Sequence, residues 1–146
     1  MQKLQRKYEK ALEAFKSRVL NELGKRIQSI VIYGSVARGE ATEDSDIDVL
    51  VLSDDKRVRE KVSDIAYEID FEYDFETFIM PIHLTTDEFE HKIKVGSPFI
   101  SSILKEGVIL YDDGTFKRIC EKIAENPTRF ITFATAFRIG ICFLFN

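Results

Sequence analysis

Hydrophobic positions along the first third of the chain change from a helical to a strand-like pattern. Over residues 3–23 the apolar side chains recur every three or four positions, which predicts an amphipathic helix, and Gly24 is well placed to end it. Residues 27–33 and 46–52 are short runs rich in β-branched side chains and predict two buried strands. The segment 34–45 between them has no apolar period and predicts a loop, with room for one helical turn.

The middle of the chain predicts a second long helix, followed by an extended segment. Apolar side chains from Val58 to Ile69 keep helical spacing. Acidic and aromatic residues then alternate from residue 70 to residue 76, and a period of two is typical of an extended chain. We therefore expect a strand over about 75–84, with Pro81 favouring a sheet edge or a bulge.

The remaining pattern adds helices and one more strand. Thr86 could cap a helix over 87–94, and a further helix should start at Ser97 and close at Gly107, followed by a strand at 108–111 and then helix again. This order predicts the α/β (α+β) class, with helices packed against a small mixed sheet. We expect a single domain over residues 1–146, with a core at about 27–111 and a C-terminal helical segment at 114–146.

Charge is unevenly distributed along this acidic chain, which has a formal net charge of −4. Lys and Arg are in excess over residues 1–26, whereas acids are in excess afterwards and no Lys or Arg occurs between Lys61 and Lys92. A free-standing nucleic-acid binder usually carries a basic excess, so nucleic acid is not an expected partner. The acidic stretch is compatible with a solvated surface or with a site for metal ions.

The C-terminal end is strongly apolar but too short to cross a membrane, because Arg138 interrupts the run from Phe130 to Phe145. We expect it to be buried, either within the chain or in a homo-oligomer. Cys120 and Cys142 fit no zinc or redox spacing and predict idle thiols. His83 and His91 also match no compact zinc pattern and predict structural roles. A soluble, cytoplasmic protein is expected.

Candidate chemistry is concentrated where the first predicted strand ends and the second begins. Asp46 and Asp48 are two positions apart on a strand, so their carboxylates project from one face. Two such carboxylates repel each other unless a cation lies between them, and hard oxygen ligands suit Mg²⁺ together with substrate phosphates. The pair therefore predicts a metal–phosphate site.

Gly34 lies at the other side of this predicted site, directly after the first strand. Without a Cβ, its backbone can approach a phosphate closely, while Ser35 adds a hydroxyl donor and Arg38 a cation. A P-loop is excluded, because Glu40 and Ala41 stand where Lys and Ser or Thr are required. A dinucleotide-binding Gly-x-Gly-x-x-Gly is also missing from the sequence.

The composite motif, Gly34-Ser35 followed after ten residues by Asp46-x-Asp48, resembles the signature of the DNA polymerase beta-like nucleotidyltransferases. The wider string over residues 31–52 is similar to their minimal, stand-alone branch. The resemblance implies a nucleotidyltransferase fold and transfer of a nucleoside monophosphate, here AMP from ATP, with two Mg²⁺ ions held by acidic side chains. It assigns nucleotide binding to Gly34, Ser35, Arg38 and Ser45, and catalysis and metal binding to Asp46, Asp48 and a third carboxylate.

The third carboxylate should lie on a neighbouring strand, and several acids compete for the position. Asp74 and Glu76 share one face of the predicted extended segment. We favour Glu76, with Asp74 as the second choice. If neither is in place, the domain could bind nucleotide without catalysing transfer.

The resemblance leaves three hypotheses for the function of the chain. Stand-alone members are similar to antitoxins of toxin–antitoxin pairs, whose partner is a small helical HEPN protein, so a protein adenylyltransferase is the first hypothesis. The second is a small-molecule enzyme similar to those that modify aminoglycosides, although only about 32 residues remain after Gly114 for a further domain. The third is a non-catalytic nucleotide-binding module that masks its partner.

Overall fold

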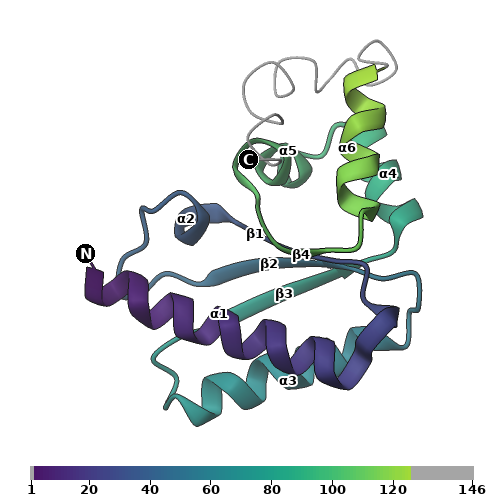
Figure 1. Ribbon diagram of the computed structural model, residues 1–146. Helices are drawn as coiled ribbons and strands as arrows, with labels where there is room; N and C mark the ends of the chain where they lie inside the picture. The colour runs from purple at the N-terminus through teal and green to yellow at the C-terminus, as the bar shows by residue number, and fades with distance from the viewer. Residues whose placement is uncertain (1, 126–146) are drawn as a thin grey trace.

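The computed structural model describes residues 2–125, which form a four-stranded mixed sheet with helices on both faces (Figure 1). The strands are β1 (Ser29–Tyr33), β2 (Ile47–Leu52), β3 (Ile79–Leu84) and β4 (Val108–Asp112), in the order β3-β2-β1-β4. β1 pairs antiparallel with β2 and β4, whereas β2 and β3 run parallel. The predicted mixed α/β sheet is confirmed, and Pro81 does lie on an edge strand.

The helices divide between the two faces of this sheet. In Figure 1, α1 and α3 lie below it and α4, α5 and α6 above it. Their bounds are α1 (Gln2–Leu23), α3 (Val58–Glu72), α4 (Thr86–Val95), α5 (Pro98–Glu106) and α6 (Thr115–Glu125), with short turns η1 (Gly24–Arg26) and α2 (Gly34–Ala37).

The alternation of side chains along the strands produces two separate cores. On β1, Ile30 and Ile32 pack with α1 and α3, whereas Val31 and Tyr33 pack with the side chains of α4, α5 and α6. Every residue of β1 is therefore buried. This two-sided burial explains why its sequence reads as a continuous apolar run.

The alternating acidic and aromatic segment is not the extended strand that its period predicted. α3 continues to Glu72 and β3 begins only at Ile79, so residues 73–78 form a turn. Asp70, buried at the end of α3, accepts hydrogen bonds from the Thr77 hydroxyl (3.1 Å) and the Ile79 backbone N–H (3.0 Å). These bonds tie β3 to the helix and leave no extended chain before Ile79. The inference that residues 74 and 76 share a strand face was wrong.

The following helix also starts one residue earlier than predicted. Thr85, rather than Thr86, is the N-cap of α4. Its hydroxyl accepts a hydrogen bond from the Glu88 backbone N–H (3.1 Å), and the Glu88 carboxylate accepts from the Thr85 N–H (3.0 Å). The two residues thus form a reciprocal capping box.

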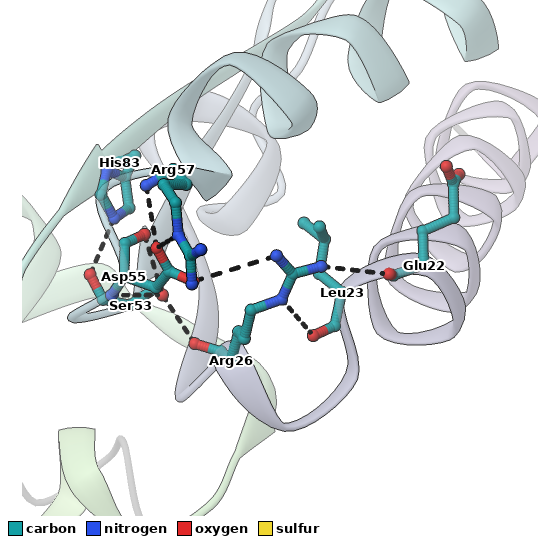
Figure 2. Close-up of polar contacts among 7 residues, drawn as sticks. All are labelled: Glu22, Leu23, Arg26, Ser53, Asp55, Arg57 and His83. Carbon is teal, nitrogen blue, oxygen red and sulfur yellow. Dashed lines mark hydrogen bonds and ion pairs between the residues drawn. The ribbon is translucent and has the colours of Figure 1, made fainter.

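A network of hydrogen bonds connects the end of β2 with β3 and with the turn after α1 (Figure 2). His83 lies 2.8 Å from the Ser53 carbonyl through Nε2, while Arg59 donates to its Nδ1 at 3.1 Å. Nδ1 therefore acts as an acceptor for Arg59, and Nε2 faces the Ser53 carbonyl as a donor. Ser53 in turn donates to the Arg26 carbonyl at 2.6 Å. The predicted structural role of His83 is confirmed.

Several predictions concern residues beyond this part of the chain. Burial of the apolar C-terminus, the oligomer through it and the role of Cys142 all fall in 126–146, outside the described residues. Cys120 is buried, and this burial raises the pKa of its thiol. Among residues 2–125, no helix is both long and apolar enough to span a membrane.

Candidate nucleotide site

The candidate site begins at the sharp turn between β1 and α2. Gly34 follows Tyr33 directly and adopts a positive φ of 79°, which L side chains rarely tolerate. A Cβ built on Gly34 would lie 2.3 Å from Oδ2 of Asp48, which is a steric overlap. The backbone turn and the carboxylate are therefore packed directly against each other, and only glycine fits between them.

The two aspartates of the motif lie at the start of β2. Asp48 pairs in register with Tyr33 on β1 and with Met80 on β3, so it projects from the middle of three strands. Asp46 directly precedes the strand, and the neighbouring Ile47 N–H donates to the Phe78 carbonyl at 2.8 Å. The structure thus places Asp46 exposed at the rim and Asp48 half-buried beside the glycine turn.

The surroundings of Asp48 oppose its negative charge and would favour a cation beside it. Burial raises the pKa of Asp48, the negative charge of Asp46 raises it further, and Arg38 partly opposes both. Burial also raises the pKa of the neighbouring Tyr33, with a contribution from Asp48, so this phenol stays protonated. A charged Asp48 is disfavoured by its surroundings, and a cation coordinated to both carboxylates would relieve this cost.

Ser45 and its neighbours form the turn that delivers Asp46. The Ser45 hydroxyl accepts a hydrogen bond from the Thr42 N–H at 2.8 Å, and the Ser45 N–H donates to the Thr42 carbonyl at 3.1 Å. The Tyr8 hydroxyl, from the buried face of α1, donates to the Thr42 carbonyl as well. Tyr8 therefore anchors the turn from α1. Its helical spacing predicted only a place on the apolar face of that helix.

Arg38 lies at the end of α2 and is held by two carboxylates. Its guanidinium contacts Glu40 at 2.9 Å and Glu106 of α5 at 2.8 Å. These bonds fix the arginine between the glycine turn and the α5 side of the molecule. To meet a phosphate as predicted, Arg38 would exchange at least one carboxylate partner for a phosphate oxygen.

The third carboxylate is not supplied by the strand next to β2. Glu76 and Asp74 are exposed in the 73–78 turn, and β3 itself contains no acid. Within residues 2–125, no group of three or more His, Cys, Asp or Glu side chains is arranged to hold a metal ion. Instead, Met80 stands in register with Asp48 on the neighbouring strand.

Sequence comparison identifies the class of protein that this fold and site define. The chain matches the family described as Nucleotidyltransferase domain over residues 9–111, and it belongs to that family. The matched region contains β1, β2 and β3, all but the last residue of β4, the glycine turn and both aspartates. The chain is therefore a nucleotidyltransferase, an enzyme that transfers a nucleoside monophosphate, as the motif had indicated.

Two relatives from Methanocaldococcus jannaschii are each named "Putative protein adenylyltransferase". One is 31% identical over 103 residues, covering 70% of this chain and 97% of the relative. The other is 34% identical over 118 residues, covering 77% of this chain and 78% of the relative.

Solved structures with a similar but more distant arrangement are toxin–antitoxin complexes. A toxin–antitoxin crystal structure with AMP-PNP has a TM-score of 0.43 and 17% identity, and the match covers 78% of this chain and 91% of that one. A complex of tri-AMPylated Shewanella oneidensis HEPN toxin with MNT antitoxin has a TM-score of 0.37 and 16% identity, covering 88% and 94%. The family assignment rests on the sequence matches.

Proposed function

We propose that this chain transfers AMP from ATP to a hydroxyl group of a partner protein, as a toxin-neutralising adenylyltransferase acting on a HEPN-type helical protein. The observation that carries the proposal is the direct contact between the Gly34 turn and Asp48, with Asp46 beside it. The names of the two relatives favour a protein acceptor over a small molecule. The resemblance of residues 31–52 to antitoxin nucleotidyltransferases supports the choice of partner.

In the proposed reaction, the acceptor hydroxyl oxygen attacks the α-phosphorus of ATP. A new P–O bond to the acceptor forms, the bond from the α-phosphorus to the bridging oxygen breaks, pyrophosphate leaves, and the hydroxyl proton passes to solvent. Asp46 and Asp48 would hold the divalent metal, which we expect to be two Mg²⁺ ions. Bound Mg²⁺ supplies charge neutralisation for the triphosphate and the carboxylates. Gly34 and Ser35 position the phosphates, so that orientation contributes much of the rate.

Glu76 remains our candidate for the third carboxylate, with Asp74 second. Support comes from the position of the 73–78 turn, because Phe78 at its end accepts the hydrogen bond from Ile47, next to Asp46. A substitution separates catalysis from binding: Glu76→Gln should leave ATP affinity largely intact and abolish transfer. Full transfer by Glu76→Gln, with loss in Asp74→Asn, would move the assignment to Asp74.

The experiment combines the chain with the product of the adjacent gene, labelled ATP and Mg²⁺, and detects AMP on that protein by mass spectrometry. Asp46→Asn and Asp48→Asn keep the side-chain shape and remove the charge, so each should lose Mg²⁺-dependent ATP binding by calorimetry and also lose transfer. Unchanged ATP affinity in both variants would refute the site. Nucleotidylation of an amino sugar with an unmodified partner would favour the small-molecule hypothesis, and ATP binding without any transfer would favour the non-catalytic module.

A further inference from the structure

An apolar surface begins next to the candidate site and continues around the edge of the sheet. Tyr67 and Phe71 on α3 are each 63% exposed, Phe78 is 48% exposed and Met80 is 51% exposed. We call this surface the aromatic patch; its members are Tyr67, Phe71, Phe75, Phe78, Met80 and Ile82. Large side chains of this kind are usually buried, so a contiguous exposed group marks a contact surface.

The rings of the aromatic patch form one connected cluster centred on Phe75. Its ring centroid lies 5.7 Å from that of Tyr67, 6.1 Å from that of Phe71 and 6.1 Å from that of Phe78. Helix α3 contributes Tyr67 and Phe71 to this cluster, and the 73–78 turn contributes Phe75 and Phe78. The exposed rings are therefore ordered against one another rather than scattered singly over the surface.

Phe75 reaches this exposed position through a strained backbone conformation. Asp74 and Phe75 have φ values of 54° and 55°, and within residues 2–125 they are the non-glycine residues with positive φ. Such a conformation is strained for a residue with a side chain and is often found at functional sites. The strain and the exposed rings both raise the free energy of the unbound protein. A partner that covers the patch would remove the apolar surface from water.

The aromatic patch is continuous with the site chemistry. Met80 pairs in register with Asp48, so both side chains project from the same sheet face on adjacent strands. Ile82 follows two positions along β3, on the same face. A partner that lies on the patch therefore reaches the carboxylate pair.

The acidic residues around the patch favour a positively charged partner. Glu68, Glu72, Asp74 and Glu76 are exposed around the rings, and no Lys or Arg occurs from residue 62 to residue 91. Arg18 of α1 pairs with Glu72 (2.9 Å) and Glu68 (3.8 Å), whereas Asp74 and Glu76 have no ion pair within the described part of the chain. A second copy docking symmetrically would bring like charges together, and nucleic acid or an anionic membrane would be repelled.

From these observations we propose that the aromatic patch docks the acceptor protein through an apolar area flanked by Lys or Arg, and so directs its hydroxyl to Asp48. The proposal rests on the proposed function for the identity of the partner as acceptor. Docking uses side chains rather than strand addition, because Pro81 interrupts the row of N–H donors on the edge strand.

The test uses three substitutions with matched exposure. Tyr67→Ser and Phe71→Ser remove exposed rings of the patch, and the control Val95→Ser removes an equally exposed apolar side chain (63%) at the end of α4. The probe is the protein encoded by the adjacent gene. We expect Tyr67→Ser and Phe71→Ser to weaken its binding roughly tenfold or more by calorimetry, as loss of an aromatic anchor does. Val95→Ser should bind like the parent, and circular dichroism should show all three folded.

Two further readouts complete the test. Affinity for the probe should fall as NaCl rises from about 50 to about 300 mM, because salt screens the charges around the patch. Light scattering of the chain alone should give the same mass for Phe71→Ser as for the parent. A dimer that Phe71→Ser dissociates would assign the patch to a second copy and overturn the proposal.

The outcomes separate this inference from the proposed function. If the probe is adenylylated and the patch variants bind and modify it as well as the parent does, the docking surface is wrong and the proposed function stands. If the probe binds in a patch-dependent way but receives no AMP, docking stands and the proposed activity fails. If the probe neither binds nor is modified, both are overturned for this partner.

Discussion

At the scale of single residues, the site depends on one position that has no side chain. Gly34 turns the chain after β1 with a positive φ and leaves the space that Asp48 occupies. Tyr33 and Asp48 are paired across β1 and β2, so the turn and the carboxylate are brought together by the sheet register. Gly34 is therefore required to make room for the Asp48 carboxylate, in addition to the close approach of a phosphate that the motif predicts.

Gly34→Ala should weaken nucleotide binding strongly while leaving the protein folded. The new methyl group would overlap Asp48 Oδ2, so the carboxylate must move away from the turn. Gly39→Ala and Gly24→Ala are matched controls, because both glycines have a positive φ but nothing lies within 4 Å of the position that a Cβ would take. All three variants should lose about 1–2 kcal/mol of stability from backbone strain. Calorimetry should show at least about tenfold weaker ATP binding only for Gly34→Ala; equal loss in Gly39→Ala would contradict the overlap mechanism.

At the scale of elements, short polar contacts decide where helices and strands begin. The capping box of Thr85 and Glu88 fixes the start of α4 directly after β3. Asp54, in the loop after β2, accepts from the Thr86 N–H at 2.9 Å and thereby joins the same helix start to the neighbouring strand. These contacts hold the end of the edge strand that carries Met80 and Ile82.

The capping box should make stability depend on pH. The hydrogen bond from the Thr85 N–H lowers the pKa of Glu88. The Glu88 carboxylate therefore stabilises the fold above its unfolded pKa of about 4.3, and this contribution is lost as the pH falls through the lower folded pKa. Urea unfolding should show Glu88→Gln less stable than the parent at pH 7, with the difference disappearing towards pH 3 or below.

Asp87→Asn is the control for Glu88→Gln, because Asp87 lies in the same first turn of α4. It should show a smaller difference in the same urea experiment, since it is outside the capping box. Thr85→Ala, which removes the other half of the box, should cost about 1 kcal/mol at pH 7. A pH-independent difference for Glu88→Gln would show that the carboxylate does not act through its charge.

At the scale of the whole molecule, the fold keeps Asp48 in surroundings that disfavour its negative charge. α1 and α3 cover one face of the sheet, while α4, α5 and α6 cover the other (Figure 1). Asp48 on β2 is half-buried and pairs with both β1 and β3. Burial and Asp46 both oppose its negative charge. Function and stability are therefore expected to trade against each other at this position.

Asp48→Asn should raise the melting temperature of the free protein and remove its response to ligand. Neutral Asn relieves both the burial of charge and the repulsion by Asp46. With Mg²⁺ and ATP at about 100 times Kd, the parent should gain about 2.7 kcal/mol, whereas Asp48→Asn should gain almost nothing. Thermal denaturation with and without Mg²⁺-ATP measures both effects. A variant less stable than the parent without ligand would show that Asp48 has a structural role that outweighs its charge.

The sequence alone determined the class of fold and the heart of the site, because both depend on local patterns. Strand and helix periods follow from side-chain spacing, and the glycine turn and Asp46-x-Asp48 lie within 15 residues of each other along two adjacent strands. Their approach needed only the pairing of β1 with β2. The family match over residues 9–111 confirms the nucleotidyltransferase class, while the roles of Gly34, Asp46 and Asp48 stay predictions.

Tertiary structure decided what surrounds that pair. The alternating acids and aromatics after α3 had the period of a strand, but the buried contacts of Asp70 with Thr77 and Ile79 bend them into a turn. Long-range parallel pairing then placed Met80, not an acid, beside Asp48, and the same turn brought Phe75 against the rings of α3. No local period encodes these contacts, because they depend on which strand lies next to β2 and on where α3 ends.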